Sequence, residues 1–245
     1  IDETFCFDTF ADRVAEVIDK TVNVDRLLEL CTVEFSGEQT EDVVCSGNRK
    51  IAIARDEAFN FMYRENVEAL KRAGEVVFFS PLRDKSLPEA DMVYFPGGYP
   101  ELHLAELAAN EGMRQSVRKY CETGGRVLAE CGGMMYLCDT ITGDDGKVYP
   151  MVGVLKQGAT MEQMKLKLGY REVRVNGQRI RGHEFHYSRI LPTNEKIPVI
   201  GTIYNAKDMV VDTPVYTYKN VLASYIHFYW GECGMDHFLM LMSQK

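Results

Sequence analysis

The sequence predicts a doubly wound α/β fold, in which a mostly parallel sheet is covered by helices and carries a β-rich insertion. Between residues 50 and 141, short apolar runs alternate with longer segments of helical periodicity, which is typical of strands buried in a parallel sheet. From residue 152 to about residue 212 the helical periodicity is lost and strand-like runs predominate, which predicts the insertion. The 245 residues, 46% of them hydrophobic, can bury a sizeable core.

The elements expected along the chain follow from these patterns. Strands are predicted where three or four apolar residues run together, at residues 50–54, 75–80, 91–95 and 125–130. Helices are predicted where apolar residues recur every three or four positions, at residues 63–74, 101–109, 111–123 and 133–141. Within the insertion, strands are predicted at residues 171–175, 179–190 and 198–204. A further buried strand is expected at residues 221–226 and a closing helix at residues 234–242.

The first 48 residues differ from the rest of the chain. Two helical patterns precede residue 34, one with Phe10, Val14 and Val17 on a single face and one led by Asp25 as its N-cap. Residues 34–50 are polar, acidic and weakly patterned, so we expect a linker there. The predicted domain organisation is therefore an N-terminal piece at residues 1–48 and one α/β domain at residues 49–245.

Composition excludes several functional classes. The formal net charge of −8 argues against wholesale binding of nucleic acid or of an anionic membrane. No apolar run approaches the roughly 20 residues that span a bilayer, and no secretory signal opens the chain. Seven cysteines without regular spacing or a CxxC pair favour neither a disulfide framework nor a structural zinc site. We expect free thiols and a cytoplasmic protein.

One cysteine lies at the junction of a predicted strand and a predicted helix, in RVLAECGGMMYLC. Cys131 falls at the carboxyl end of a parallel strand, where ligands bind in open α/β sheets. Gly132 and Gly133 leave room for a sharp turn, and a helix N-terminus stabilises a thiolate and can cradle an oxyanion. These features predict a nucleophile elbow built on cysteine. The alternative is a small buried residue at a packed turn.

Two other stretches complete the predicted site. Pro96, Gly97 and Gly98 end another strand, so their backbone N–H groups can face Cys131, although PGG alone indicates only a turn. His227 follows the predicted strand at residues 221–226 and can act as the base for the thiol. The alternative for His227 is a histidine packed among its aromatic neighbours.

Four stretches together resemble the triad-type (class I) glutamine amidotransferases. They are PGGYPE, ECGGMMYL, GHEFHYS and ASYIHF, in this order along residues 96–228. The resemblance covers about residues 49–240 and is closest to the cobyric acid branch, in particular to the glutaminase domains of cobyrinic acid a,c-diamide synthases. It implies a flavodoxin-like fold with a β-rich insertion.

The resemblance also implies roles for individual residues. Cys131 matches the nucleophile that attacks the glutamine side-chain amide, and His227 matches the catalytic histidine. Gly98 and Gly132 match the oxyanion-hole positions, and Tyr99 lies beside the glutamine pocket. In many relatives a glutamate follows two residues after the histidine, but Tyr229 stands there in this chain. The third member of the triad is therefore left open, although Glu232 is near in sequence.

The GHEFHYS stretch admits more than one interpretation. His183, Glu184 and His186 are metal-ligand types, but the spacing is not HExxH and a strand places Glu184 and His186 on the face opposite His183. The resemblance places this stretch on the active-site side, which implies a substrate-binding or accessory role, and an ordinary solvated strand is the alternative. Six basic side chains nearby could form a surface that binds a polycarboxylate, but the default interpretation is a strand face exposed to solvent. They are Lys165, Lys167, Arg171, Arg174, Arg179 and Arg181.

The predicted function is the release of ammonia from glutamine, for ATP-dependent amidation of the a and c side chains of cobyrinic or hydrogenobyrinic acid. No GxxxxGK[ST] loop occurs, so the resemblance places ATP and magnesium in an upstream domain, of which residues 1–48 are the expected tail and linker. No cofactor or metal is expected in the chain itself. The expected partners are glutamine and, through that domain, a corrinoid precursor, and a homodimer is left open. The alternatives are a stand-alone cysteine hydrolase or peptidase and a catalytically silent docking domain.

Overall fold

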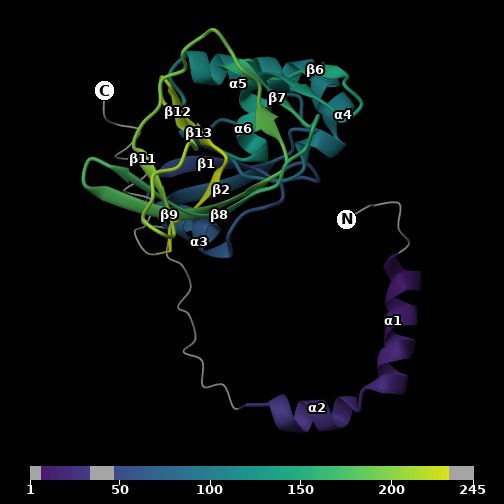
Figure 1. Cartoon of the computed structure of the whole chain (residues 1–245). Coiled ribbons are helices and arrows are strands. Elements are labelled where there is room, and N and C mark those ends of the chain that lie inside the picture. The colour runs from purple at the N-terminus through teal and green to yellow at the C-terminus, as the bar shows by residue number, and fades with distance from the viewer. Residues whose placement is uncertain (1–6, 34–46, 232–245) are drawn as a thin grey trace. The chain divides into compact units, whose positions relative to one another are not determined.

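The computed structural model describes residues 7–33 and 47–231 (Figure 1). The chain separates into two units, Ile1–Asp42 and Val43–Lys245. The first contains the helices α1 (Phe7–Thr21) and α2 (Val24–Cys31), whose described side chains are exposed. The N-cap of α2 is Asn23 rather than the predicted Asp25, because the Asn23 side chain accepts a hydrogen bond from the Arg26 backbone N–H. Most of the predicted linker lies outside the described residues.

A six-stranded sheet forms the centre of the second unit. Its order is β12-β13-β4-β3-β1-β2, in which all neighbours pair in parallel except β12 with β13. The five parallel strands in the order β2-β1-β3-β4-β13 match the flavodoxin-like arrangement and confirm the predicted fold class. Their bounds are β1 Arg49–Ala54, β2 Gly74–Phe79, β3 Met92–Phe95, β4 Arg126–Glu130, β12 Val215–Tyr218 and β13 Val221–Ser224.

Alternate residues of the central strands enter two separate cores. Ala52, Val93 and Val127 pack with α4, α5 and α6, whereas their neighbours Ile51 and Met92 pack with α3 and a second sheet. Figure 1 shows α3 on the opposite side of the sheet from α4, α5 and α6. These helices, with the 3₁₀ turn η1, are α3 Arg64–Ala73, η1 Pro100–Leu102, α4 Leu104–Ala109, α5 Glu111–Glu122 and α6 Gly132–Leu137. Burial on both faces explains the continuous apolar strands.

The β-rich insertion starts earlier than predicted. The helix expected at residues 133–141 ends at Leu137, and Cys138 is extended, with φ −64° and ψ 169°. The β-branched residues that follow favour a strand. The insertion forms two four-stranded sheets, β10-β7-β5-β6 and β11-β8-β9-β14. Their strands are β5 Cys138–Thr142, β6 Val148–Pro150, β7 Leu155–Thr160, β8 Lys167–Val175, β9 Gln178–His186, β10 Arg189–Ile190, β11 Thr202–Asn205 and β14 Ile226–Tyr229.

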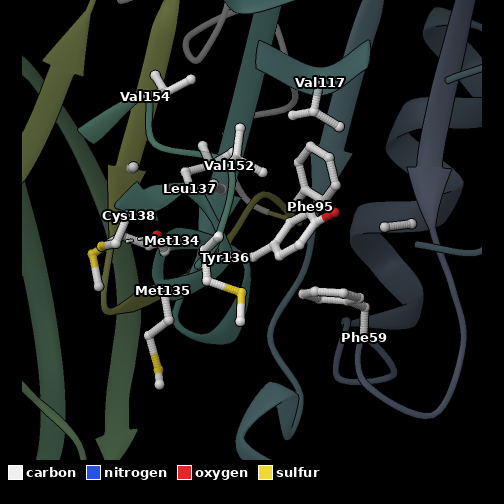
Figure 2. Close-up of a cluster of buried hydrophobic side chains, with 14 of the residues drawn as sticks. Phe59, Phe95, Val117, Met134, Met135, Tyr136, Leu137, Cys138, Val152 and Val154 are labelled. Atoms are coloured by element: carbon white, nitrogen blue, oxygen red, sulfur yellow. Dashed lines mark hydrogen bonds between the residues drawn. The ribbon is translucent and has the colours of Figure 1, made fainter. Parts of the chain in front are cut away.

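The helix α6 is anchored through aromatic contacts on its buried face (Figure 2). The ring of Tyr136 lies 5.4 Å from that of Phe59 and 5.7 Å from that of Phe95, measured between centroids. All six residues of α6 are buried. The turn that precedes the helix is therefore held in a rigid core.

The predicted strand at residues 221–226 is divided between two sheets. β13 ends at Ser224 in the six-stranded sheet, and β14 begins at Ile226 in the sheet that contains β8 and β9. The Ser224 hydroxyl accepts a hydrogen bond from the Ile226 N–H and donates one to the Pro214 carbonyl, which stabilises the change of direction at Tyr225. The predicted closing helix at residues 234–242 lies outside the described residues. Among the described helices, none has the length and hydropathy of a membrane span.

Candidate active site

Cys131 occupies the sharp turn between β4 and α6. Its φ of +47° lies in a region that non-glycine residues rarely adopt. The two glycines that follow are required by close packing, since a Cβ on Gly132 would lie 2.7 Å from Pro100 Cδ and one on Gly133 would lie 2.3 Å from the Phe95 carbonyl oxygen. The geometry is that of the predicted elbow.

The second glycine turn lies against this elbow. A Cβ on Gly132 would lie 3.2 Å from the carbonyl oxygen of Gly98, so the two turns are in contact. Gly98 itself has φ +156°, and a Cβ there would lie 2.2 Å from the Ala58 carbonyl oxygen. Both turns thus need glycine for steric reasons, and they bring the two predicted oxyanion-hole residues together beside Cys131.

The thiol lines two cavities. The first, of about 320 Å³, contains both predicted catalytic side chains and is lined by Phe61, Gly98, Tyr99, Cys131, His183, Phe185 and His227. The second, of about 220 Å³, also contains Cys131, Gly98, Tyr99 and Phe185, and extends to His186 and Ser188. Tyr99 is half-exposed and belongs to both. Every predicted site residue therefore lines one of these two cavities, except Gly132, which lies in the turn behind Cys131, and Glu184.

His227 reaches the cavity from β14, not from the end of a six-stranded-sheet strand as predicted. It is 4% exposed, and its ring packs against Gly97, where a Cβ would lie 2.2 Å from His227 Cε1. The Phe61 ring lies edge-on at 4.7 Å and the His183 ring is stacked at 4.8 Å, both between centroids. His227 Nδ1 has no hydrogen-bond partner among the described residues. No described carboxylate orients this histidine.

Side chains from two other elements hold β14 in place. Glu130, which precedes Cys131, accepts a hydrogen bond from the Phe228 N–H at 3.1 Å and another from the Tyr94 hydroxyl at 2.7 Å. On α3, the Asn66 side chain donates to the Phe228 carbonyl and accepts from the Trp230 N–H. Burial raises the pKa of Glu130 to about 8. The residue before the thiol is thus linked to the residue after the imidazole.

Burial also determines the charge state of the thiol and the imidazole. It raises the pKa of Cys131 to about 12, helped by the Glu101 carboxylate and opposed by the hydrogen bond from the Gly132 N–H. It lowers the pKa of His227 to about 3, and protonation of the neighbouring His183 or His186 would oppose a charge on His227 further. The expectation of a thiolate stabilised by the helix N-terminus is therefore not met, because desolvation outweighs one N–H group. The resting pair is a neutral thiol beside a neutral imidazole.

The strand β9 presents its residues as the alternation predicts. Glu184 and His186 are buried, whereas Phe185 is exposed and His183 is half-buried. The Glu184 carboxylate has no exposed surface and is occupied by four neighbours. They are Arg171 at 2.7 Å, Thr213 at 2.9 Å, Lys167 at 3.2 Å and His186 at 2.8 Å. Although burial alone would raise it, these partners lower the pKa of Glu184 to about 2.

This network assigns several of the predicted cations to structural partners. Arg171 and Lys167 contact Glu184, and Arg174 contacts Glu172 and Asp208. Lys165 and Lys167 line a third cavity, of about 500 Å³, which His186 also borders. In the described part of the chain, no group of three or more His, Cys, Asp or Glu side chains is arranged to hold a metal ion.

Two aromatic residues of the site were not anticipated. Phe61 lies in the cavity against His227, and the Tyr63 hydroxyl is 2.6 Å from His183 Nδ1. Both follow β1, at the same edge of the sheet as Cys131. The cluster FNFMY directly after a predicted strand was a signal that could have located them.

Known proteins are similar to this chain in sequence. The family model of the CobB/CobQ-like glutamine amidotransferase domain matches residues 50–234. A cobyrinate a,c-diamide synthase of Salmonella typhimurium is 34% identical over 231 residues, which cover 89% of this chain and 50% of that protein. A hydrogenobyrinate a,c-diamide synthase of Pseudomonas aeruginosa is 39% identical over 181 residues, 74% of this chain and 41% of that protein. The chain thus spans about half the length of the curated relatives it matches.

Solved structures agree on the fold. A protein from Thermoplasma acidophilum that is described as a GMP synthase component superposes with a TM-score of 0.51 and 13% identity. The match covers 80% of this chain and 95% of that one. At this identity the similarity concerns the fold alone.

Proposed function

Because this chain belongs to the CobB/CobQ-like glutamine amidotransferase domain family, we propose that it hydrolyses glutamine at Cys131 and supplies the ammonia for an amidation. One observation carries the proposal. The thiol of Cys131, on a strained turn of one sheet, shares a cavity of about 320 Å³ with the imidazole of His227, on a strand of another. A buried thiol and an imidazole that meet in one cavity suit nucleophilic catalysis.

The proposed reaction starts from neutral groups. The Cys131 sulfur attacks the carboxamide carbon of glutamine while His227 takes the thiol proton. Backbone N–H groups of Gly98 and Gly132 stabilise the oxyanion. His227 returns the proton to the leaving nitrogen, which departs as ammonia and leaves a γ-glutamyl thioester. Water then adds to the thioester carbon, glutamate leaves, and the thiol regains its proton.

We assign substrate recognition to the half-exposed Tyr99 and accessory roles at the same site to the histidines of β9. Tyr99 borders both cavities that contain the thiol, so we propose that it contacts glutamine. His183 and His186 border one cavity each. Glu184 is fully buried, so in this proposal it acts indirectly, by fixing His186.

The complete reaction extends beyond glutamine hydrolysis. Relatives named cobyrinate and hydrogenobyrinate a,c-diamide synthases support a corrinoid carboxylate as the acceptor. We propose amidation of its a and c side chains. Activation of a carboxylate requires an energy source, which we assign to ATP and magnesium bound by a separate ATP-binding domain.

Covalent labelling tests the glutaminase assignment. The protein is treated with diazo-oxo-norleucine, an electrophile that mimics glutamine, and the adduct is located by peptide mass mapping, with Cys131→Ala as control. We expect one adduct, on Cys131, that glutamine prevents and a small peptide does not. Labelling that a peptide prevents would favour a peptidase. A folded protein that neither labels nor hydrolyses glutamine, with or without an ATP-binding domain, would contradict the proposal in favour of a docking domain.

A further inference from the structure

A second histidine lies face to face with His227. His183 stands directly opposite it in the antiparallel register of β9 and β14. The two rings are stacked with 4.8 Å between centroids and 14° between planes. The remaining contacts of the His227 ring are an edge from Phe61 and the backbone of Gly97. Among the described residues, His183 is thus the one whose ring stacks on the His227 ring, and this stacking sets the plane of the His227 ring.

His183 is itself fixed by a hydrogen bond. The Tyr63 hydroxyl lies 2.6 Å from its Nδ1, and the Tyr63 ring packs edge-on against Tyr229. Burial raises the pKa of Tyr63, so the phenol keeps its proton and can donate it to Nδ1. A ring that accepts at Nδ1 carries its single proton on Nε2 and is neutral. With the Tyr63 hydroxyl as the donor in this hydrogen bond, the contact favours an uncharged His183.

An uncharged stacked ring suits the proposed reaction. His227 becomes an imidazolium when it takes the thiol proton, and no described carboxylate is bonded to it. The face of a neutral aromatic ring attracts a cation, whereas a second imidazolium would repel it. Burial lowers the pKa of His183, which agrees with an uncharged ring.

We propose that Tyr63 and His183 are positioning residues, which orient the His227 imidazole and stabilise its protonated form in place of a carboxylate. This inference rests on the glutaminase function proposed above. It differs from direct substrate binding by His183, because the effect passes through the neighbouring ring.

Other titratable groups surround this pair. Cys131 shares its cavity, and Glu130 reaches β14 through the Phe228 N–H. Tyr170 is opposite His183 on β8. On the neighbouring positions of β9 and β14 lie Arg181, Glu184, His186 and Tyr229. Because Glu184 and His186 are bonded to each other on the opposite face of β9, the variants below leave that pair intact.

The experiment compares four variants in the full chain, supplied with an ATP-binding domain where glutaminase activity needs one. His183→Asn removes the ring, His183→Phe keeps a ring that cannot be charged, and Tyr63→Phe removes only the hydroxyl. Tyr170→Phe is the matched control, since this tyrosine is 75% exposed. The measurements are kcat and KM for glutamine from pH 5 to 9, the labelling rate of Cys131, and circular dichroism to verify folding.

We expect His183→Asn to lower kcat by at least about tenfold with little change in KM. His183→Phe should stay within about threefold of the wild type, because the ring face is retained. Tyr63→Phe should shift the acidic limb of the kcat profile to higher pH, since His183 then accepts a proton more readily and repels the imidazolium. Tyr170→Phe should match the wild type.

Other outcomes separate this inference from the proposed function. A raised KM with unchanged kcat in His183→Asn would make His183 a substrate contact and overturn the inference. So would a wild-type pH profile in Tyr63→Phe, or His183→Phe as impaired as His183→Asn. In these cases wild-type labelling and hydrolysis would still support the glutaminase. A wild-type chain that neither labels nor hydrolyses glutamine would overturn both.

Discussion

His227 and His186 lie on neighbouring strands of the same four-stranded sheet, yet their surroundings are opposite. Both nitrogens of His186 face acceptors, the Ser188 carbonyl at 2.7 Å and the Glu184 carboxylate at 2.8 Å, and its ring is stacked on Tyr225. His227 is equally buried, but its Nδ1 has no partner among the described residues. Buried polar groups are normally hydrogen-bonded, and exceptions concentrate at reactive sites. The Glu184 network is therefore fully hydrogen-bonded, whereas the thiol cavity contains a buried nitrogen that has no partner among the described residues, as the proposed chemistry requires.

The largest expected effect comes from removing the Glu184 carboxylate, which lies at the centre of the hydrogen-bonded Glu184 network. Glu184→Ala leaves the buried Arg171 guanidinium without its carboxylate, and we expect a loss of about 3–5 kcal/mol in the free energy of unfolding, measured with urea. Glu172→Ala, on β8, is the control and should cost much less, because its partner Arg174 is more exposed. Equal losses in the two variants would contradict the special role of the Glu184 network.

A smaller effect in free energy, on the activation barrier, is expected when the His227 ring is shifted while all functional groups of the thiol cavity are kept. In Gly97→Ala, the new Cβ would lie 2.2 Å from His227 Cε1, so the ring must move. Misplacement by about 1 Å typically costs about a hundredfold in rate, so we expect kcat for glutamine to fall by about that factor. The matched control is Gly112→Ala on α5, whose Cβ would lie 2.7 Å from the Lys85 carbonyl oxygen. It should reduce stability and leave kcat unchanged; a reduced kcat there would point to a global effect.

The smallest effect is a difference in pH dependence between the two regions. The pKa of His227 is lowered to about 3 in the folded protein, whereas the unfolded chain binds the proton near its ordinary value of 6.5. The contribution of His227 to stability should therefore fall as the pH decreases from 6.5 towards 3, by up to about 1.4 kcal/mol per pH unit, whereas Glu130, with its pKa raised to about 8, contributes in the opposite direction above pH 4.5 in both the wild type and the variants. The pKa of Glu184, lowered to about 2, adds a loss that begins only below about pH 4.5.

Urea unfolding at pH 7.5 and pH 5.5 isolates the histidine contribution. His227→Gln removes the titrating group, so its stability should decrease less between these two pH values than that of the wild type. Glu184→Gln should decrease as much as the wild type over the same interval. Identical pH dependence in His227→Gln and the wild type would show that the pKa of His227 does not differ between the folded and the unfolded state.

Local patterns predicted the elbow at Cys131 and the parallel strands, because both depend on neighbouring residues. Alternation along β9 likewise predicted that Glu184 and His186 share a face. The strand break at Tyr225 was not predicted, since VLASYI is apolar apart from Ser224 and the change of sheet depends on tertiary pairing. The aromatic contacts of Phe61 and Tyr63 depend on how the strand ends meet, so their role could not be read from spacing.

The change of sheet at Tyr225 makes assembly of the site an all-or-none event. Cys131 follows β4 of the six-stranded sheet and His227 lies on β14 of the four-stranded one, and Tyr225 alone joins β14 to β13, the strand that pairs with β4. If β14 paired with β9 one residue out of step, the imidazole would point to the opposite face. A slip of two residues would carry it along the strand by about 7 Å. Under the proposed function, the domain therefore has no partly competent arrangement, and Cys131 meets the imidazole proposed as its base only when both sheets have paired in register.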